Sequence, residues 1–560
     1  MPTLEWVGKN KVVNYHQKVP FRVLERIYSY DKKGMHSEDN GSENMIIHGD
    51  NLEALKALLP RYEGKVKCIY IDPPYNTGNE NWVYNDNVND PQIRKWLGEV
   101  VGKEGEDLSR HDKWLCMMYP RLNLLQKLLA DDGVIFISIG EDEQANLEII
   151  CDQIFGKHNF VTNFSRQMKS GGAKGKYYTP NLDYILAYAK NISSLPYFRA
   201  VMTQKQISIF YKFTEKVGPR KGQIYGEERL FKASLEARPN QRYYIRCPDG
   251  SLAIPPGTNF PSVKKEGITV LPGEQDKVWK WIYPRYQKEL AAGNIIFKRT
   301  KTSGLIDETG KKSIWNIYNK LWLSEQQKKG VVPSNLILEF ENRQSAKEIA
   351  ELKLNFTYAK PVNLIEYILT ISNQPKDAII LDSFAGSGTT AHAVLNMNKS
   401  DGGHRKFILV EMMDYANTIT AERVRRVING YGEGKSAVEG TGGSFSYYEL
   451  GEPLFLKNSM LNEKVPVEKI REYVYHMETQ QAVSAAVGGE PYLLGTKNGT
   501  AYYFYYEKQK VTSLDHDFLR SLTTQATSRV IYADCCLLND EELKRYSITF
   551  KKIPRDIPKL

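Results

Sequence analysis

The sequence predicts an α/β protein with a parallel, doubly wound sheet that is interrupted by an inserted α+β region. Apolar strand-like runs alternate with helical segments along residues 45–192, and the same alternation returns along residues 345–430. Between them, short strand-like pieces and Pro/Gly turns replace this pattern. A chain of 560 residues is also too long for one ordinary domain. We therefore expect one sheet assembled from two halves that flank an insertion.

The first half begins after residues 1–44, which are expected to form an extended or helical arm ending in a polar loop. The patterns predict a strand at 45–47, a helix at 51–59, a strand at 66–71, a helix at 114–129, a strand at 133–139 and a helix at 143–155. Residues 160–164 and 184–189 are expected to form a hairpin around a Lys/Gly loop at 169–176. The segment 76–110 is rich in Asn, Asp and Gly, as is typical of a functional lid or a partner-binding element.

The second half repeats the alternation after the insertion. The patterns predict a helix at 361–370, a strand at 378–381, a helix at 389–396, a strand at 406–410 and a helix at 415–429 with Asp414 as its N-cap. Residues 431–560 follow as a less regular portion, with strand-like pieces at 444–450 and 500–506. We expect this portion to form a separate C-terminal domain.

The composition favours a globular protein of the cytoplasm. Hydrophobic residues make up 41% of the chain and charged residues 25%. No apolar stretch reaches the roughly 20 residues that span a bilayer, and the start of the chain lacks the apolar segment of a signal peptide. The six cysteines form no CxxC pair and have no histidines at metal-ligand spacing. We therefore expect no metal site and no membrane partner.

Positive charge is concentrated in the middle of the chain. Residues 160–330 contain 30 lysines and arginines against 13 acidic residues, whereas the remainder contains 46 against 53. A basic block of this kind suits a surface that neutralises phosphates. A solvated lysine-rich insertion is the alternative. Aromatic residues are interleaved with these charges, which favours contact with nucleic acid.

Residues 382–390 (DSFAGSGTT) follow a predicted strand and open a predicted helix. Gly386 and Gly388 permit a tight turn and the close backbone approach that a bound nucleoside requires. A lone G-x-G is also common in purely structural turns, and the absence of GK[ST] disfavours a triphosphate site. Glu411, at the end of the next strand, stands where a ribose diol needs an acceptor. The combination favours a nucleoside cofactor.

Residues 72–75 (DPPY) follow another predicted strand. The Asp72 carboxylate and the Pro73 carbonyl are two adjacent acceptors, which suit an amino group with two donors. Tyr75 offers a flat face for base stacking, worth about 1–3 kcal/mol. An amino group inside a duplex is reached only if its nucleotide is flipped out. The loop therefore suits methylation of a base amine, although a Pro-rich turn with a capping Asp remains the alternative.

In this order, the DPPY and FAGSG strings resemble the β-group of DNA amino-methyltransferases. The resemblance covers about residues 45–190 and 345–450 and is greatest for the Mod subunit of type III restriction-modification systems. Further matches are DPPYNTG at 72–78, residues 111–122 and GSFSYYELG at 443–451. The resemblance implies a Rossmann-like methyltransferase sheet in circularly permuted order, with an inserted target-recognition domain and a C-terminal α/β extension.

The resemblance also implies a cofactor, S-adenosyl-methionine, and roles for individual residues. The catalytic residues would be Asp72, Pro73, Pro74 and Tyr75, and the cofactor would be bound by Asp50, Asp72, Lys360, Pro361, Asp382, Phe384, Gly386, Gly388, Thr389 and Glu411. Lys360 and Pro361 match the motif that opens the helix beside the methionine moiety, and Asp50 would lie near the adenine. Asp rather than Ser at position 72 is typical of adenine-N6 enzymes.

The implied domains are an arm (1–44), two methyltransferase halves (45–192 and 345–430), a target-recognition domain (193–344) and a C-terminal domain for dimer or partner contacts (431–560). The implied partners are double-stranded DNA, a second copy of the chain and a separate restriction subunit with helicase and nuclease activity. Candidates for DNA contact are Lys169, Lys174, Lys176, Tyr177 and Tyr178, and a solvated loop would explain them equally well.

Three other functions compete with this hypothesis. The first is a solitary or type II-like adenine methyltransferase that has no restriction partner. The second is methylation of RNA or of a protein amide, which Asp rather than Asn at position 72 and the basic insertion disfavour. The third is an inactive methyltransferase fold that binds DNA, which the intact Asp72, Tyr75, Gly386, Gly388 and Glu411 disfavour.

Overall fold

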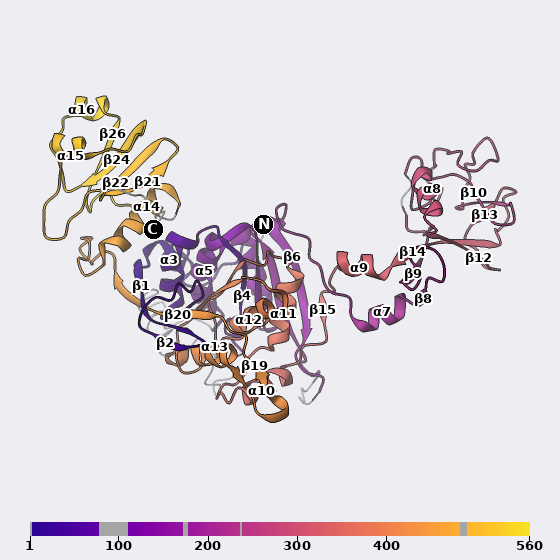
Figure 1. The fold of residues 1–560 in the computed structure, drawn as a ribbon, viewed down its shortest axis with the longest axis horizontal. Helices are drawn as coiled ribbons and strands as arrows, with labels where there is room; N and C mark the ends of the chain where they lie inside the picture. The colour runs from indigo at the N-terminus through magenta and orange to yellow at the C-terminus, as the bar shows by residue number, and fades with distance from the viewer. Residues whose placement is uncertain (1–2, 78–109, 172–176, 236–237, 482–489, 560) are drawn as a thin grey trace. The chain divides into compact units, whose positions relative to one another are not determined.

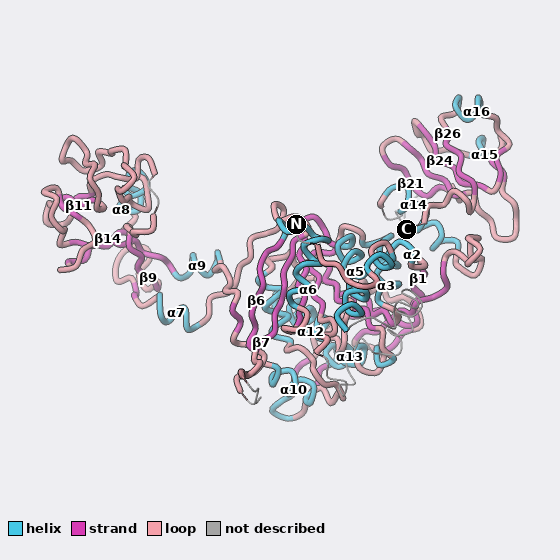
Figure 2. The backbone as a smooth tube through the Cα atoms, turned by 180° about the vertical axis from the view of Figure 1, so that it is seen from behind, coloured by secondary structure: helices cyan, strands magenta, loops and turns pink. Residues whose placement is uncertain are grey.

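The computed structural model describes residues 3–77, 110–171, 177–235, 238–481 and 490–559. The chain divides into two compact units (Figures 1 and 2). One unit consists of Met1–Phe198 together with Ser334–Leu560, and the other of Arg199–Pro333. Within the described ranges, no helix is both long and apolar enough to cross a bilayer.

The larger unit is built on an eleven-stranded sheet (Figure 1) with the order β15-β6-β7-β5-β4-β16-β17-β3-β20-β1-β2. The parallel centre consists of β5 (Leu129–Ile139), β4 (Val66–Ile71), β16 (Ile379–Asp382), β17 (Lys406–Glu411), β3 (Met45–His48) and β20 (Ser444–Pro453). One side carries the antiparallel hairpin β6 (Phe160–Gln167) and β7 (Leu182–Ala189), flanked by β15 (Leu336–Ile337), and the other side carries β1 (Arg22–Asp31) and β2 (Gly34–His36).

Helices cover both faces of this sheet. The helices α3 (Asn51–Tyr62), α5 (Arg110–Leu128) and α6 (Gln144–Cys151) form one group, and α11 (Val362–Ile371), α12 (Thr389–Asp401) and α13 (Thr420–Asn429) form another. Successive residues of a strand point to opposite faces. Ile69 and Ile71 of β4 therefore pack into the core with α3 and α5, whereas the Cys68 thiol hydrogen-bonds with Ser372 at the end of α11. The predicted doubly wound α/β sheet is confirmed.

The strand order explains how two distant motifs meet. Strands β3 and β4 follow each other in the first half of the chain, yet β16 and β17 of the second half lie between them. Leu381 of β16 is in register with Ile69 of β4, and Glu411 of β17 with His48 of β3. Because these strands are parallel, the loops that follow β4 and β16 emerge side by side at one edge, where open α/β sheets bind ligands.

Three segments differ from the expected elements. Residues 1–44 are not an arm: after α1 (Lys9–Val12) and α2 (Tyr15–Lys18), β1 joins the main sheet by pairing with β20. The sequence of β1, RVLERIYSYD, has no clear period of 2 or 3.6, so it does not indicate whether the segment forms a strand or a helix. The strand at 444–450 likewise belongs to the main sheet. Asp414 starts a short 3-10 turn (Asp414–Ala416), and α13 begins at Thr420 without a side-chain cap.

The remaining portion of the larger unit has its own small sheet near the C-terminus. The order is β21 (Leu493–Lys497), β22 (Thr500–Phe504), β24 (Ser528–Ala533) and β26 (Ile548–Lys552), and β23 (Ser513–Leu514) pairs with β25 (Cys535–Cys536). The helices here are α14 (Val467–Thr479), α15 (His516–Ser521) and α16 (Asp540–Arg545). This sheet packs its own core around Phe518, Tyr503 and Ile531.

The smaller unit, Arg199–Pro333, contains two antiparallel sheets. One has the order β12 (Ile295–Arg299), β14 (Trp315–Trp322), β9 (Ile224–Arg229) and β8 (Phe213–Thr214), and the other β10 (Ile245–Arg246), β11 (Leu252–Ile254) and β13 (Ile306–Asp307). Its helices are α7 (Gln204–Phe210), α8 (Tyr283–Ala291) and α9 (Leu323–Lys329). Buried aromatic residues, including Tyr243, Trp279 and Tyr286, form its core. Helix α8 begins at Tyr283, with Pro284 in its first turn, where proline is favoured.

Candidate active site

The loop after β4 is held rigidly by side chains from distant segments. The Lys360 ammonium lies 2.6 Å from both carboxylate oxygens of Asp72. The Trp114 indole on α5 donates a 2.7 Å hydrogen bond to the Pro74 carbonyl. No donor in the described part of the chain reaches the Pro73 carbonyl, which remains available as an acceptor. Asn76 turns the chain with a φ of 57° and donates to the Arg110 carbonyl. The predicted pair of acceptors, Asp72 and Pro73, is therefore fixed in place.

Tyr75 is anchored at its hydroxyl and covered on its ring. The hydroxyl donates to a carboxylate oxygen of Asp183 at 3.3 Å, and the Lys360 ammonium lies 4.8 Å from the ring centroid. Burial and the nearby carboxylates of Asp72 and Asp183 raise the pKa of Tyr75 well above its ordinary value. The side chain is therefore neutral at physiological pH, and its hydroxyl can act as a donor.

Lys360 connects the two halves of the site. It immediately precedes Pro361, which is the N-cap residue of α11, and its side chain is 10% exposed. The resemblance places this lysine beside the cofactor, and the structure places its ammonium on Asp72 and over Tyr75. The second half of the chain thus supplies a cation to the loop that follows β4 in the first half.

The loop after β16 has the backbone conformation that its glycines permit. Gly386 and Gly388 have φ values of 51° and 82°, a region that other residues rarely adopt. At Gly388 a Cβ atom would also lie 3.0 Å from the Thr420 carbonyl oxygen, so a side chain is disfavoured for two reasons. Asp382 closes the loop by accepting from the Phe384 amide at 3.0 Å and the Thr390 hydroxyl at 2.6 Å.

Glu411 lies directly against the glycine loop. One carboxylate oxygen accepts from the Gly386 amide at 2.7 Å, and the other accepts from the Met413 amide at 3.0 Å. Burial raises the pKa of Glu411 to about 7. Burial, with smaller contributions from the charges of Asp72 and Glu411, also raises the pKa of Asp382 to about 7. Two buried carboxyl groups at the glycine loop thus have pKa values near neutral pH.

The two raised pKa values predict how stability changes with pH. Because Asp382 and Glu411 bind protons more tightly in the folded chain than in the unfolded chain, their contribution to stability is greatest below about pH 4. It should fall as the pH rises from about 4 to about 7 and stay constant above that. Urea unfolding of the cofactor-free protein between pH 5 and 8 should show this loss. The Asp382→Asn/Glu411→Gln variant should show a flatter profile, and an equally steep one would contradict the assignment.

The loop is suited to a polar ligand such as a nucleoside. The Ser383 hydroxyl is buried and has no hydrogen-bond partner among the described residues. The two oxygens of Glu411 have four lone pairs, and the Gly386 and Met413 amides donate to them at 2.7 and 3.0 Å. The Met412 amide and the Tyr415 hydroxyl also favour its charged form, so a ribose diol would share the carboxylate with these groups. The residues present therefore fit the expected cofactor.

Asp50, Thr389 and Phe384 have identifiable structural positions. Asp50 follows β3 and caps α3, accepting from the Leu52 and Glu53 amides, and one of its oxygens lies 3.4 Å from Arg121. Thr389 opens α12, and its hydroxyl accepts a 2.8 Å hydrogen bond from Arg423. Phe384 packs, partly buried, against the main core. Asp50 is thus brought to the same edge of the sheet as Glu411.

Only some of the residues expected to contact DNA lie in the described part of the chain. Lys174 and Lys176 lie outside the described residues, as does most of the lid expected at 76–110. Tyr177 and Tyr178 are exposed, and the Tyr178 hydroxyl donates to Glu141 at 3.1 Å. Lys169 is partly buried near the end of β6. Tyr177 and Tyr178 remain accessible for stacking.

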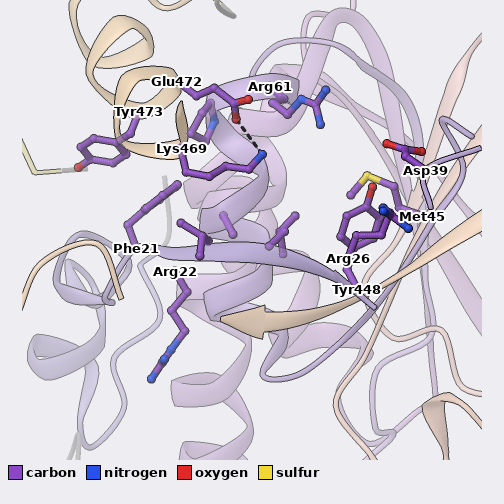
Figure 3. A pocket seen from close by; sticks show the side chains of 14 residues that line it. Phe21, Arg22, Arg26, Asp39, Met45, Arg61, Tyr448, Lys469, Glu472 and Tyr473 are labelled. Carbon is purple, nitrogen blue, oxygen red and sulfur yellow. Dashed lines mark hydrogen bonds and ion pairs between the residues drawn. The ribbon is translucent and has the colours of Figure 1, made fainter. Parts of the chain in front are cut away.

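A separate pocket of about 370 Å³ lies away from these loops (Figure 3). It is lined by Phe21, Arg22, Val23, Leu24, Arg26, Asp39, Met45, Ala57, Pro60, Arg61, Tyr448, Lys469, Glu472 and Tyr473. Met45 is the first residue of β3, so this pocket lies near the amino end of the strand, whereas the candidate site follows the carboxyl ends. Lys469 is paired with Glu472 at 3.2 Å. None of the predicted site residues lines this pocket.

Several residues of the site were not predicted from the sequence. Trp114, Arg423 and Asp183 contact the predicted residues directly, through Pro74, Thr389 and Tyr75. Arg423 also donates to the Ser387 hydroxyl at 2.7 Å and is fully buried. The sequence does contain one indication of this role: Arg423 lies on the apolar face of an amphipathic helix. Buried arginines are rare unless they are paired, so an arginine at such a position indicates a buried partner.

Comparison with known proteins identifies the family. Residues 66–422, which include both loops, match the family model described as DNA methylase, of the N6/N4 type. The chain belongs to this DNA methylase family.

Similar methylases include the Mod subunits of two type III restriction-modification enzymes. The chain is 30% identical to the EcoPI Mod subunit of Escherichia phage P1 over 454 residues, which cover 74% of this chain and 64% of that protein. It is 32% identical to the StyLTI Mod subunit of Salmonella typhimurium over 393 residues, which cover 67% and 53%. The chain therefore spans between about half and two thirds of the length of these Mod subunits. The type II methyltransferase M.KpnI of Klebsiella pneumoniae is 30% identical, over 68% of this chain and 82% of that protein.

Proposed function

We propose that this DNA methylase is a sequence-specific DNA adenine-N6 methyltransferase that uses S-adenosyl-methionine, and that it acts as the modification and recognition subunit of a type III restriction-modification system. The observation that carries the proposal is the parallel pairing of β4 with β16. This pairing sets the acceptor loop at Asp72 beside the glycine loop at Gly386. Similarity to type III Mod subunits supports the assignment to that system.

The residues of the acceptor loop would hold a flipped adenine for reaction. Asp72 and the Pro73 carbonyl would accept hydrogen bonds from the exocyclic amine, and Tyr75 would stack on the base. Drawing the amine protons towards these acceptors localises the nitrogen lone pair. The proton released on methylation would pass to the Asp72 carboxylate. Positioning and preorganised acceptors would supply most of the rate, because no covalent nucleophile is needed.

S-adenosyl-methionine would supply a methyl group on a positively charged sulfur. Glu411 would accept from the ribose hydroxyls, and the backbone at Phe384, Gly386 and Gly388 would follow the nucleoside and the methionine. Lys360 and Pro361 at the start of α11 would lie beside the methionine, and Asp50 would lie near the adenine of the cofactor. Asp382 and Thr389 would stabilise the loop through their hydrogen bonds with Thr390 and Arg423.

We further propose that the sheet has the circularly permuted order of the β-group and that the inserted unit reads the DNA sequence. The proposed domains are 45–192, 193–344 and 345–430, and the compact unit Arg199–Pro333 lies within the second of these ranges. The unit Arg199–Pro333 supports a nucleic-acid role because it contains 25 lysines and arginines against 12 acidic residues. Phe210 and Phe213 of this unit are exposed, as is expected of residues that stack on or wedge into DNA.

The partners are proposed from the same assignment. A type III modification subunit would form a homodimer and would bind a restriction subunit with helicase and nuclease activity. The portion from residue 431 onwards would supply contacts for these partners. Size-exclusion chromatography with light scattering tests the dimer.

Sequencing of modified bases tests the function directly. Genomic DNA from a methylation-deficient bacterial strain that expresses this chain should contain N6-methyladenine within one short sequence motif. DNA from cells that express the Asp72→Ala variant should lack it. Methylation of cytosine would refute the base assignment, and unmodified DNA from cells with abundant folded protein would refute the proposed activity.

A second candidate is a type II-like adenine methyltransferase without a restriction subunit. The length of M.KpnI favours it, because the match covers 82% of that protein but only 53–64% of the two Mod subunits. A restriction subunit encoded beside this chain that co-purifies with it would decide for the type III system. Methylation with no such partner would decide for the type II-like enzyme.

A further inference from the structure

A buried ion pair lies behind the catalytic loop, on the hairpin β6–β7. Arg166 of β6 is fully buried, and Asp183 of β7 is 2% exposed. The guanidinium contacts both oxygens of the carboxylate, with its Nε 2.7 Å from one of them. Burying two charges has a desolvation cost that such a pair seldom recovers relative to apolar residues of the same size. The pair therefore calls for an explanation other than stability.

The pair holds the hydroxyl of Tyr75. This hydroxyl donates to the same Asp183 oxygen that Arg166 contacts. Behind the ring there is little free space, because a Cβ atom at Gly140 would lie 3.1 Å from the ring carbon Cδ2. The hydroxyl bond, the Gly140 backbone and the Lys360 ammonium together define where the ring lies.

Arg166 also holds the segment by which the chain returns from the inserted unit. It donates to the Phe340 carbonyl at 2.8 Å and to the Asn342 side chain at 3.0 Å. This segment joins the sheet unit through β15, where Ile337 is in register with Arg166 itself. One guanidinium thus connects Tyr75, through Asp183, with the backbone that follows residue 333.

The protonation states suit this arrangement. Burial acts to lower the pKa of Arg166, and the hydrogen bonds and charge of Asp183 outweigh it, so that the pKa lies above its ordinary value. Arg166 is therefore charged, and Tyr75 is a neutral donor. The titratable groups around Tyr75 are Asp72, Lys360, Asp183, Arg166 and Tyr70.

We propose that Asp183 and Arg166 are positioning residues that fix the Tyr75 ring for stacking on the flipped adenine and connect its position to the return segment of the inserted unit. This inference rests on the proposed methylation of DNA. When the inserted unit binds its target sequence, a displacement of the return segment would therefore change the position of the Tyr75 ring.

The test compares Asp183→Asn with Tyr75→Phe. Tyr75→Phe removes the hydroxyl bond, whereas Asp183→Asn weakens it and also removes the charge partner of Arg166, and both variants keep the ring. Tyr75→Phe should lower kcat about tenfold and Asp183→Asn at least as much, with the dissociation constant of S-adenosyl-methionine unchanged. If Asp183 acts on the ring through this bond, the double variant should be no slower than Asp183→Asn alone. Additive effects, or wild-type kcat in both single variants, would overturn the proposal.

A fluorescence measurement distinguishes a loss of Tyr75 positioning from a general loosening of the hairpin β6–β7. With 2-aminopurine at the target adenine, a base stacked on a fixed Tyr75 is quenched, and both variants should give brighter bound complexes than the wild type. Tyr188→Phe is the matched control, because this buried tyrosine of β7 donates to Asp152 at 2.9 Å, away from the catalytic loop. Its kcat and fluorescence should equal those of the wild type. The same brightening in this control would attribute the effect to the hairpin as a whole and overturn the proposal.

Asn342→Ala tests the connection to the return segment. It removes one acceptor of Arg166 and leaves the pair with Asp183 intact. We expect a brighter complex and a lower kcat, with unchanged cofactor affinity. Wild-type fluorescence and kcat in this variant would show that the return segment does not influence the position of Tyr75. A wild-type protein that methylates no DNA at all would instead refute the proposed function, so the two failures are distinguishable.

Discussion

Replacing Asp72 with alanine should abolish methylation, with kcat reduced at least about 10³-fold. In the proposed mechanism the carboxylate is one of the two acceptors for the base amine, and it would receive the proton that the product releases. Cofactor binding should be largely retained, because the glycine loop keeps its hydrogen bonds to Glu411 and Asp382. The measurement is single-turnover methylation of a duplex that contains the motif, together with calorimetric titration of S-adenosyl-methionine.

The Lys360 ammonium requires a control for this variant. In Asp72→Ala it would be left without its partner at a position that is only 10% exposed, and an unpaired buried charge destabilises a fold. The double variant Asp72→Ala/Lys360→Met removes that charge and should unfold close to the temperature of the wild type while remaining inactive. Substantial activity in either variant would show that Asp72 is not the acceptor.

The strands of the parallel centre could be predicted because the apolar pattern that indicates each of them lies within a few consecutive residues. The run 66–71 matches β4, and the run 406–410 matches β17 to within one residue. Strands buried on both faces are apolar along their whole length, so that pattern is hard to mistake. The loops that follow them contain residues with fixed conformational properties, proline and glycine. Membership of the DNA methylase family confirms the resemblance that these two loops suggested.

The contacts that complete the site could not be predicted, because they depend on which strands are neighbours. Asp183 and Arg166 are separated from Tyr75 by about a hundred residues of sequence and reach it through the position of the hairpin in the sheet. Trp114 is the first residue of the helix predicted at 114–129, and nothing in that helical pattern shows that its indole donates to Pro74. The strand β1 was missed for a related reason, since its pairing with β20 is a long-range contact.

Replacing Glu411 with glutamine should weaken S-adenosyl-methionine binding about 100-fold at pH 8. The substitution keeps the shape of the side chain and an oxygen for the Gly386 amide. It removes the charge, however, and hydrogen bonds from ribose hydroxyls to a charged acceptor are worth about 1.5–3 kcal/mol each. Equilibrium dialysis with labelled cofactor provides the measurement. Asp382→Asn is the matched control, because its carboxylate is already used by Phe384 and Thr390, and it should weaken binding less.

The pH dependence of binding identifies the group that acts. The pKa of Glu411 is raised to about 7 by burial, so this side chain is increasingly protonated below pH 7 in the free protein. A ribose that donates to it favours the ionised form, so binding below pH 7 should release a proton, and affinity should fall as the pH is lowered. This direction is opposite to the pH dependence expected for the stability of the cofactor-free protein. Calorimetric titrations in buffers of different ionisation enthalpy should detect the released proton in the wild type and not in Glu411→Gln. Equal proton release in both proteins would assign the titration to another group and remove Glu411 from the ribose site.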